Sequence, residues 1–388
     1  MQKLAIIITH PIQYYAPVFK LLQERQNILI NVFYTWGEAA QHKFDPGFGK
    51  NISWDIPLLD GYPYEWVHNI ASDPGSHHAK GIDNPGLIEQ VLHWQPDAIL
   101  IYGWFYKSHL KAIRYFKGKV PVIFRGDSTL LDDSGGLRSV VRSFFLRWVY
   151  SKVDHALYTG TNNKRYFKKF GLKEARLTFA PHAVDNDRFA AARDNEAEAL
   201  RTQLGIGKNE ILILFAGKFQ PKKAPDLLLT AFTELRIPGA HLLFTGNGVL
   251  ENELKNKATG HKNIHFTEFK NQNDMPVIYQ ACDLFCLPSK GPGETWGLAV
   301  NEAMACGKAI IVSNKSGCAV DLVKPGLNGY IFDIGQPAML REYLFELASS
   351  KSSLQGFGEQ SRIIIKDWNF TKIAAAIEDV VVSYNCHL

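Results

Sequence analysis

Short apolar runs alternate with helix-like segments along the whole chain. Within each run, apolar residues follow one another without the polar alternation of a half-exposed strand. Such runs are typical of strands covered on both faces, and therefore of parallel sheets whose strands are joined by helices. They lie at residues 4–8, 28–34, 98–102, 120–124 and 155–158, and again at 211–216, 241–245, 264–266, 284–287 and 309–312. Two such series predict an α/β fold with two doubly wound, Rossmann-like domains.

The boundary between the two domains is expected where the pattern turns polar, around residues 181–207. We predict one domain over 1–184 and a second over 185–367. The remaining segment, 368–388, places Ile373, Ile377 and Val381 four positions apart. This spacing predicts a final amphipathic helix.

The composition is that of a globular protein with more than one core. The chain has 388 residues, 46% hydrophobic and 21% charged, and single cores seldom grow beyond about 250–300 residues. It contains no apolar run long enough to span a bilayer, and its apolar start is too short for a signal peptide. The five cysteines lack zinc-finger spacing, so we expect reduced, mostly buried thiols in a cytoplasmic protein. They are Cys282, Cys286, Cys306, Cys318 and Cys386.

The net charge of +5 is modest, but basic residues are concentrated in the stretch 138–169. This stretch holds eight Lys and Arg residues against one acid, Asp154, with aromatic residues interleaved. It is either a solvated helix face over a core stripe or a surface that rests on anionic lipid headgroups, where each basic residue contributes about 1 kcal/mol. No nucleic-acid-binding motif accompanies the charge, so we expect no nucleic acid partner.

Two strand ends in the second half have the makings of ligand-binding loops. One is followed by Gly217 and Lys218, and a few residues later by Lys222 and Lys223. Glycine permits close approach of a ligand, and Lys218 with Lys222 or Lys223 supplies positive charge for phosphates, although the spacing is not that of a Walker loop. The other ends in Gly246-Asn247-Gly248, which lacks the third glycine of a dinucleotide-binding fingerprint.

The stretch 293–307 is the most informative part of the chain. Two carboxylates, Glu294 and Glu302, flank the start of a short apolar helix at Gly297-Leu298. The carboxylates are suited to sugar hydroxyls, and the helix start offers free N–H groups and a positive dipole end to an anion. Hydroxyls and a diphosphate in one ligand indicate a nucleotide sugar. Structural alternatives are a helix-dipole acid for Glu294 and a partly buried salt bridge for Glu302.

In this order and spacing, these elements resemble the retaining GT-B glycosyltransferases of family 4, the glycosyl transferases group 1. The resemblance covers about 211–328 and centres on the Glu-x7-Glu element Glu294…Glu302. The family's Gly-Arg-x4-Lys phosphate clamp corresponds to Gly217-Lys218…Lys223, with lysine in place of arginine at 218. The resemblance implies a GT-B fold whose C-terminal helix crosses back to the first domain. It also implies transfer of a sugar from a nucleotide diphosphate to an acceptor, with retention at the anomeric carbon.

The resemblance further implies roles at the donor. Glu294 would lie near the donor hexose, and Glu302 would bind the ribose hydroxyls. Lys218 and Lys223 would neutralise the leaving diphosphate, because stabilising that charge is the main lever of such an enzyme. Further donor contacts are expected from Gly217, Gly246, Asn247, Phe269, Thr295, Trp296, Gly297 and Leu298. We expect no cofactor and no metal, since the only Asp-x-Asp, Asp185-Asn186-Asp187, falls on the interdomain junction.

The first half resembles the family in outline only and is expected to bind the acceptor. His10 and Gln13 follow the first strand and either line the cleft or form a structural turn. Asp127, two residues after Arg125, stands where many relatives place a histidine near the donor. It either contacts the donor sugar as a catalytic residue, caps a helix or pairs with Arg125. Trp104 either stacks on an acceptor sugar, covers a lipid carrier or packs in the core.

The sequence therefore predicts a retaining glycosyltransferase with a nucleotide sugar as donor and a glycan or lipid-linked acceptor. We expect it to serve bacterial polysaccharide or glycolipid biosynthesis, in the cytoplasm or at the inner face of the cell membrane. Two other classes remain open: a catalytically idle GT-B protein that binds sugar or scaffolds an assembly, and an NAD-dependent oxidoreductase. Intact Glu294, Lys223 and Glu302 disfavour the first class, and the incomplete Gly-x-Gly fingerprint disfavours the second.

Overall fold

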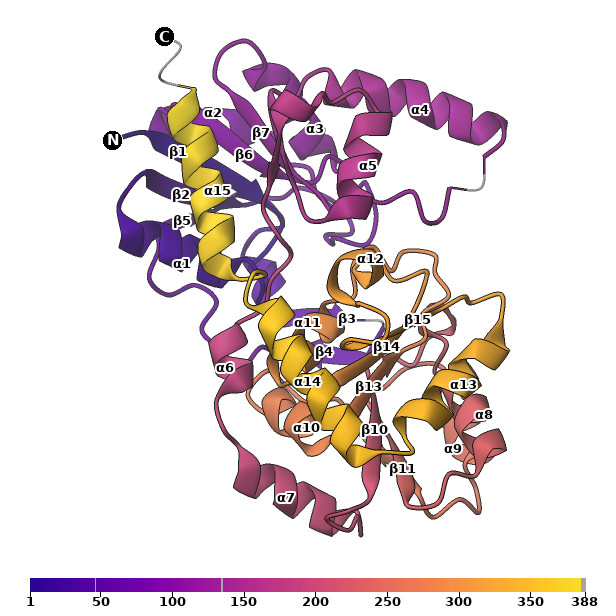
Figure 1. The fold of residues 1–388 in the computed structure, drawn as a ribbon. Coiled ribbons are helices and arrows are strands. Elements are labelled where there is room, and N and C mark those ends of the chain that lie inside the picture. Colours follow the sequence, from indigo (N-terminus) through magenta and orange to yellow (C-terminus); the bar gives the residue numbers. More distant parts are fainter. Residues whose placement is uncertain (46, 134, 385–388) are drawn as a thin grey trace. The chain divides into compact units, whose positions relative to one another are not determined.

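The computed structural model describes residues 1–45, 47–133 and 135–384. It divides into two units (Figure 1). The first unit comprises Met1–Lys43, Ile56–His182 and Phe370–Leu388, and the second comprises Phe44–Asp55 and Ala183–Asn369. The chain therefore crosses from one unit to the other after residues 43, 55, 182 and 369. The crossings after 182 and 369 lie close to the boundaries expected at 184 and 367. The sequence did not predict that residues 44–55 belong to the second unit.

The first unit is built on a parallel sheet of seven strands in the order β5-β2-β1-β6-β7-β8-β9. The order reverses between β1 and β6, and the crevice at such a reversal is where doubly wound folds bind ligands. The strands are β1 Lys3–Ile8, β2 Leu29–Tyr34, β5 Tyr64–Trp66, β6 Ala98–Tyr102, β7 Val122–Arg125, β8 His155–Tyr158 and β9 Leu177–Phe179. The helices are α1 Ala16–Arg25, α2 Leu87–Trp94, α3 Lys107–Phe116, α4 Leu137–Tyr150, α5 Thr161–Lys169 and α15 Phe370–Ser383, with short 3-10 turns at Glu38–His42 and Glu174–Arg176.

The C-terminal helix α15 belongs to this first unit and lies beside α1 (Figure 1). Its apolar stripe, which includes Ile373, Ile377 and Val381, is buried. At the same interface the carboxylate of Glu378 accepts hydrogen bonds from Arg25, at 2.8 Å, and from Asn27, at 3.0 Å. The predicted amphipathic helix is thus present, and its apolar face packs against the first unit.

The second unit is built on a parallel sheet of six strands in the order β12-β11-β10-β13-β14-β15. The order again reverses, here between β10 and β13. The strands are β10 Ile211–Ala216, β11 Ala240–Thr245, β12 Ile264–Thr267, β13 Leu284–Leu287, β14 Ala309–Ser313 and β15 Gly329–Phe332. The helices are α6 Asn186–Ala190, α7 Asp194–Gln203, α8 Pro225–Leu235, α9 Glu251–Lys257, α10 Met275–Ala281, α11 Leu298–Ala305, α12 Ala319–Leu322, α13 Pro337–Leu347 and α14 Lys351–Ile365, with a 3-10 turn, η3, at Pro221–Lys223.

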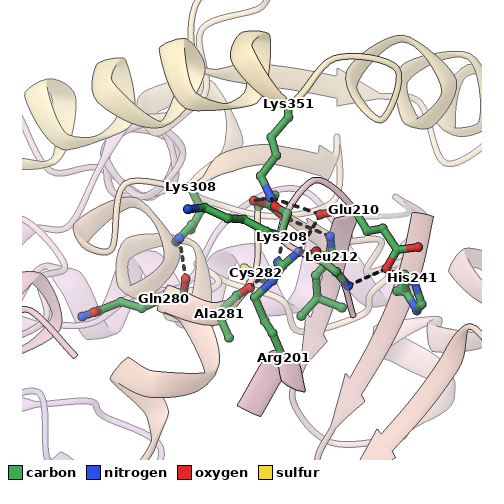
Figure 2. A network of polar contacts seen from close by, with 12 residues as sticks. Arg201, Lys208, Glu210, Leu212, His241, Gln280, Ala281, Cys282, Lys308 and Lys351 are labelled. Carbon is green, nitrogen blue, oxygen red and sulfur yellow. Dashed lines mark hydrogen bonds and ion pairs between the residues drawn. The ribbon is translucent and has the colours of Figure 1, made fainter. Parts of the chain in front are cut away.

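A polar network ties together the amino-terminal edge of this second sheet (Figure 2). Arg201 of α7 donates to the backbone oxygen of Ala281, at 2.9 Å, and to Asp283, at 3.0 Å. Asp283 also accepts the backbone N–H of Leu212, at 2.8 Å, and Lys351 of α14 donates to the backbone oxygen of Glu210, at 3.1 Å. Burial lowers the pKa of Lys351. Backbone carbonyls and a carboxylate already accept the hydrogen bonds of these cations, so this edge has a structural role. The opposite edge, where the strands have their carboxyl ends, is the candidate for chemistry.

The predicted α/β class with two parallel sheets is confirmed. All ten predicted strands are present, with bounds shifted by at most a few residues. The sequence pattern missed β5, β9 and β15, because each has only three or four residues; a polar residue interrupts β5 and β9, and β15 begins with a glycine. It also missed the two-stranded sheet of β3 Lys43–Asp45 and β4 Lys50–Ile52, which belongs largely to the inserted segment Phe44–Asp55.

Four of the five cysteines are buried thiols without a disulfide partner among the described residues. They are Cys282, Cys286, Cys306 and Cys318. Burial raises the pKa of Cys282 to about 12, so its sulfur is a thiol at neutral pH. Cys386 lies outside the described residues.

Candidate active site

The carboxyl ends of the strands in the second unit bring two glycine-containing loops into direct contact. Gly217 follows β10 and Gly246 follows β11, and these strands are neighbours in the sheet. A Cβ placed on Gly246 would stand 2.1 Å from the backbone oxygen of Gly217, and its φ of +140° disfavours any other residue. The two loops can approach this closely only because position 246 has no side chain.

Asn247 joins three of the loops at this edge. Its backbone oxygen accepts the N–H of Phe219, at 2.9 Å, and its side-chain oxygen accepts the N–H of Phe269, at 2.8 Å. Its amide group donates to Glu251, at 3.1 Å. Gly217, Gly246, Asn247 and Phe269, which the sequence proposed as donor contacts, therefore lie in one connected group of loops.

Lys223 and Glu294 form an ion pair at the same edge. Lys223 ends the 3-10 turn η3, and its ammonium lies 2.5 Å from an oxygen of Glu294 in the loop before α11. That oxygen also accepts the hydroxyl of Ser289, at 2.8 Å, and the carboxylate is buried. The N–H of Lys290 donates to the backbone oxygen of Lys222, at 2.9 Å, which fixes one loop on the other. The structure thus joins the predicted phosphate clamp to the first predicted carboxylate.

The second carboxylate, Glu302, lies inside α11 and is buried. The hydroxyl of Tyr279, in α10, donates to its Oε2 at 2.8 Å. The ring of Tyr279 in turn packs edge-on against Phe189, at a centroid distance of 5.9 Å. Tyr279 therefore orients the carboxylate, a contact that the sequence did not reveal, because an aromatic residue in an apolar helix stripe has the signature of an ordinary core residue.

Helix α11 begins directly after Gly297, which has a φ of +102°. A Cβ at this position would stand 2.9 Å from Leu287, so glycine is needed to start the helix against β13. The first-turn N–H groups, beginning at Leu298, provide the positive end of the helix dipole beside Glu294. This arrangement can hold an anion close to the Lys223–Glu294 pair.

Trp296 is placed differently from the other proposed donor contacts. Its side chain is 4% exposed, its indole N–H donates to Asn301 at 2.8 Å, and its ring packs on Trp368 at 5.1 Å. The backbone oxygen of neighbouring Thr295 stands close to Gly317, where an added Cβ would lie 1.7 Å from it. The indole ring is thus committed to the core, and the predicted donor contact of Trp296 stays a prediction for its backbone.

The first unit has a cavity of about 520 Å³ at the reversal between β1 and β6. Its walls are largely aromatic, and two arginines and an aspartate supply the charge. The lining residues include Tyr15, Tyr102, Trp104, Arg125, Asp127 and Arg142. Three of the positions singled out from the sequence, Trp104, Arg125 and Asp127, therefore share one cavity. Its size and its aromatic walls suit a sugar ring with polar substituents.

Arg125 is buried beside this cavity and has structural partners. Its guanidinium donates to the backbone oxygens of Ala180, at 2.7 Å, and Pro181, at 2.9 Å. It thereby fixes the chain that leads from β9 to the second unit. Both terminal nitrogens of the guanidinium are therefore engaged by backbone carbonyls.

Asp127 instead lies beside a histidine that the sequence did not single out. An oxygen of Asp127 stands 3.7 Å from Nε2 of His182, and the imidazole is buried. Tyr15 stacks on His182 at 6.3 Å, and burial raises the pKa of Tyr15 to about 12. Burial also lowers the pKa of His182, an effect that the carboxylate of Asp127 partly opposes. A Pro-His dipeptide at a domain boundary carries no periodic signal that would have marked His182 in advance.

His10 and Gln13 lie in the loop between β1 and α1. The imidazole of His10 is hydrogen-bonded to the hydroxyl of Thr9, at 2.8 Å, and packs edge-on against Trp36 at 5.2 Å. Gln13 is half-buried in the turn. Both alternatives for this pair, a cleft wall or a structural turn, are compatible with these contacts.

The second unit matches a known protein family. Residues 196–363 match the family model described as "Glycosyl transferases group 1". The second unit carries a glycosyl transferases group 1 domain. Over 231 residues the chain is 26% identical to "D-inositol 3-phosphate glycosyltransferase" of Mycobacterium tuberculosis (strain ATCC 25618 / H37Rv), a match that covers 56% of this chain and 46% of the relative. The chain thus spans about half the length of the curated relatives that it matches.

The fold as a whole is similar to solved glycosyltransferases. Anabaena Alr3699/HepE, solved in complex with UDP-glucose, is 18% identical with a TM-score of 0.70, over 99% of this chain and 100% of that one. Sucrose-phosphate synthase (tll1590) from Thermosynechococcus elongatus is 16% identical with a TM-score of 0.73, over 100% of both chains. At these identities the likeness shows the fold alone, and the predicted GT-B architecture is confirmed.

In the second unit, ahead of the residues that match the family, the Asp185-Asn186-Asp187 sequence has a structural use. The side chain of Asp185 accepts the N–H of Arg188, at 3.0 Å, and caps α6. In the described ranges, the side chains with metal-ligand spacing are Asp73, His77 and His78, whose ligand atoms lie within 4.8 Å of one another in the loop after β5. Neither group belongs to the edge that holds Lys223 and Glu294.

Helix α4 of the first unit exposes apolar residues together with basic ones. Val141 is 71% exposed and Phe144 is 72% exposed, and the neighbouring Arg147 is also exposed. The side chain of Arg138 lies outside the described part of the chain. Farther along the basic stretch, Lys164 and Lys168 are paired with Glu174. Over the residues that the structure describes, no helix combines the length and the apolar character needed to cross a bilayer.

Proposed function

We propose that this protein is a retaining, metal-independent glycosyltransferase that uses a nucleotide diphosphate sugar as donor. The observation that carries the proposal is the Lys223–Glu294 pair at 2.5 Å, set beside the start of α11 in a domain that matches the glycosyl transferases group 1. A cation, a carboxylate and a helix dipole at one sheet edge can bind a diphosphate and a sugar together. The likeness to a protein solved with UDP-glucose makes a uridine diphosphate sugar the first donor to test.

In this proposal the residues divide the donor among them. Lys218 and Lys223 face the diphosphate, Glu294 faces the hexose and Glu302 binds the ribose hydroxyls. Glu294 holds the ammonium of Lys223 in place before the donor arrives, so little reorganisation is needed when charge develops on the leaving phosphate. The leaving phosphate itself takes the acceptor proton on the face it vacates, which gives retention without a separate base.

We place the acceptor in the aromatic cavity of the first unit. Tyr15, Tyr102 and Trp104 offer ring faces to a sugar, and Asp127 offers a hydrogen-bond acceptor. Arg142, on α4, lines the same cavity and favours an acceptor that carries negative charge. A lipid-linked sugar phosphate combines these features, and we propose an acceptor of this kind, or a glycan, in bacterial glycolipid or polysaccharide biosynthesis.

Helix α4 favours work at a membrane surface. Its exposed Val141 and Phe144 are suited to insert among lipid headgroups, and Arg147 is suited to contact anionic ones. Phe145 connects this face to the cavity, since its ring packs on Trp104 at 5.5 Å. We therefore place the protein at the cytoplasmic face of the membrane, bound peripherally.

Thermal unfolding of the purified protein in EDTA, with UDP-, GDP-, ADP- and dTDP-sugars and with NAD(H), tests the proposal. A ligand at about 100 times its Kd stabilises the folded state by about 2.7 kcal/mol. Stabilisation by one nucleotide sugar, followed by its slow hydrolysis, would support a metal-independent transferase. Binding without any turnover would point to an idle sugar-binding protein, and stabilisation by NAD(H) alone would overturn the proposal in favour of an oxidoreductase.

A further inference from the structure

The inserted segment Phe44–Asp55 is docked on the second unit by polar contacts to the loop after β12. The side chain of Asn271 donates to the backbone oxygen of Ser53, at 2.7 Å. The backbone N–H of Asn273 donates to the carboxylate of Asp55, at 3.2 Å, and its side chain donates to the backbone oxygen of the same residue, at 2.9 Å. These bonds hold the end of the segment against the glycosyl transferases group 1 domain.

Two aromatic rings of the segment surround a ring of the candidate donor site. Phe48 packs on Phe269 at a centroid distance of 4.8 Å and an interplanar angle of 66°. Trp54 approaches the same ring at 6.3 Å and 51°. All three side chains are only half-buried. Each ring therefore keeps part of its surface exposed to solvent.

The segment also contacts the first lysine of the phosphate clamp. The ammonium of Lys218 stands over the ring of Phe48, 4.9 Å from its centroid, a cation–π arrangement. A Cβ placed on Gly47 would lie 2.6 Å from Cδ of Lys218, so the lysine stem runs directly against the backbone of the segment. Gly47 and Phe48 thus fix the position of Lys218.

Phe48 consequently touches both Phe269 and Lys218, which follow β12 and β10. Asn247 joins these two loops through its bonds to the N–H of Phe269 and, one residue after Lys218, to the N–H of Phe219. We propose that the inserted segment completes the donor site: Phe48 and Trp54, with Phe269, form an aromatic receptor for the nucleobase, and Phe48 positions Lys218 for the diphosphate. The inference rests on the proposed function, which places a nucleoside diphosphate at this edge.

The proposal assigns different tasks to the two aromatic residues. Trp54 contacts Phe269 and binds the base, so its loss should weaken the binding of nucleotides and leave the binding of a ligand without a base unchanged. Phe48 contacts both Phe269 and Lys218, so its loss should weaken the binding of both the base and the diphosphate. Base stacking on an aromatic side chain is strong enough for about a tenfold effect on affinity.

Calorimetric titration with UDP, UMP and inorganic pyrophosphate separates these tasks in the full chain. The same measurement uses GDP, ADP or dTDP and the matching monophosphate if one of them stabilises the protein best. We expect Trp54→Ala to raise the Kd of UDP and UMP about tenfold and to leave pyrophosphate unchanged. We expect Phe48→Ala to raise the Kd of all three ligands. Phe48→Tyr keeps the ring and should bind UDP within about twofold of the original protein.

Two controls keep the failures apart. Phe345→Ala removes an exposed ring from α13 in the same unit and should leave all three affinities unchanged. Glu302→Gln should weaken the binding of UDP whether or not the inserted segment contributes to the site. If UDP binds the Phe48 and Trp54 variants as tightly as the original protein while Glu302→Gln weakens it, the segment is only an anchor and the inference is overturned. If the original protein binds none of the four nucleoside diphosphates, the proposed function fails together with it.

Discussion

The two candidate sites occupy equivalent places in two parallel sheets but are made of different residues. The candidate site in the second unit consists of glycines, Asn247, two lysines and two glutamates. The cavity in the first unit is lined mainly by tyrosines and Trp104, with Arg125, Asp127 and Arg142 as its charged residues. A diphosphate sets fixed demands of charge and close approach, which few residue types meet. An acceptor sugar can be bound through shape complementarity and ring stacking, which many sequences provide. The comparison predicts that single substitutions act sharply in the second unit and more gradually in the first.

The largest expected effect is on catalysis at the Lys223–Glu294 pair. Lys223→Ala removes a cation aimed at the developing phosphate charge, and the loss of one such group typically lowers kcat about 100-fold. The donor Kd should change much less, because the charge on the phosphate grows in the transition state. Steady-state rates and calorimetric titration of the nucleotide sugar provide the two numbers.

Lys222→Ala is the matched control for that substitution. Lys222 is the neighbouring residue of the same 3-10 turn, its side chain is exposed and its backbone oxygen carries the contact to Lys290. It should therefore behave like the original protein. Equal losses of turnover and affinity in Lys223→Ala would remove the transition-state role from this lysine.

The next prediction is that acid destabilises the first unit more than the second. Burial lowers the pKa of His109 and of His155, both in the first unit, to about 4. Histidines with a lowered pKa favour folding above their ordinary pKa of about 6.5 and lose this contribution as the pH falls towards about 4. For the fully buried His109 the loss amounts to about 3 kcal/mol. In the second unit the pKa of His265 is also lowered by burial, but its ring is only half-buried.

Hydrogen exchange at pH 7 and pH 4.5 measures this difference peptide by peptide. Peptides of α3, which contains His109, and of the preceding strand β6 should lose protection before those of β10 and β13. His109→Gln keeps a polar group near Thr35, which lies 2.8 Å from the imidazole, and should flatten the dependence of stability on pH. Uniform loss of protection across both units would contradict the assignment to buried histidines.

A smaller effect is expected at the second carboxylate. Glu302→Gln should raise the Kd of the nucleotide about tenfold, since a hydrogen bond to a charged group contributes about 1.5–3 kcal/mol. Tyr279→Phe removes only the hydroxyl that donates to Glu302 at 2.8 Å and should have a weaker effect in the same direction. Titration with a nucleoside diphosphate measures both. An unchanged affinity in Glu302→Gln would remove this residue from the ribose.

Much of the second unit could be predicted from the sequence. Its strands are uninterrupted apolar runs, and its loops carry glycines and charges at fixed offsets from strand ends, so order and spacing place Gly217, Lys223 and Glu294 at one sheet edge. The contacts that support them could not be predicted. Tyr279 and Phe48 reach the site from α10 and from an insertion near the N-terminus, and neither has a local pattern that distinguishes it from a core aromatic residue.

The first unit was less predictable because its site depends on long-range contacts. His182 meets Asp127 because β7 and β9 are parallel strands of one sheet and the two residues follow their carboxyl ends. The guanidinium of Arg125 donates to carbonyls more than 50 residues along the chain. The sequence supplied three side chains of the cavity, Trp104, Arg125 and Asp127, and a role for each. It supplied no sign that Arg125 would be a structural link, since an arginine after a strand has the same local pattern in either role.

The smallest expected effect concerns helix α4 and tests whether the first unit works at a membrane. Phe144→Ser removes an exposed ring, so thermal stability should not change, whereas binding to phosphatidylcholine vesicles that contain phosphatidylglycerol should fall about three- to tenfold. Phe345→Ser removes another exposed ring, on α13, and is the matched control that should bind like the original protein. Sedimentation with and without phosphatidylglycerol separates insertion from charge, because Arg147→Ala should matter only when the anionic lipid is present. If Phe144→Ser and the original protein sediment alike, the exposed face of α4 does not contact lipid, and the acceptor of the first unit is more simply a soluble glycan.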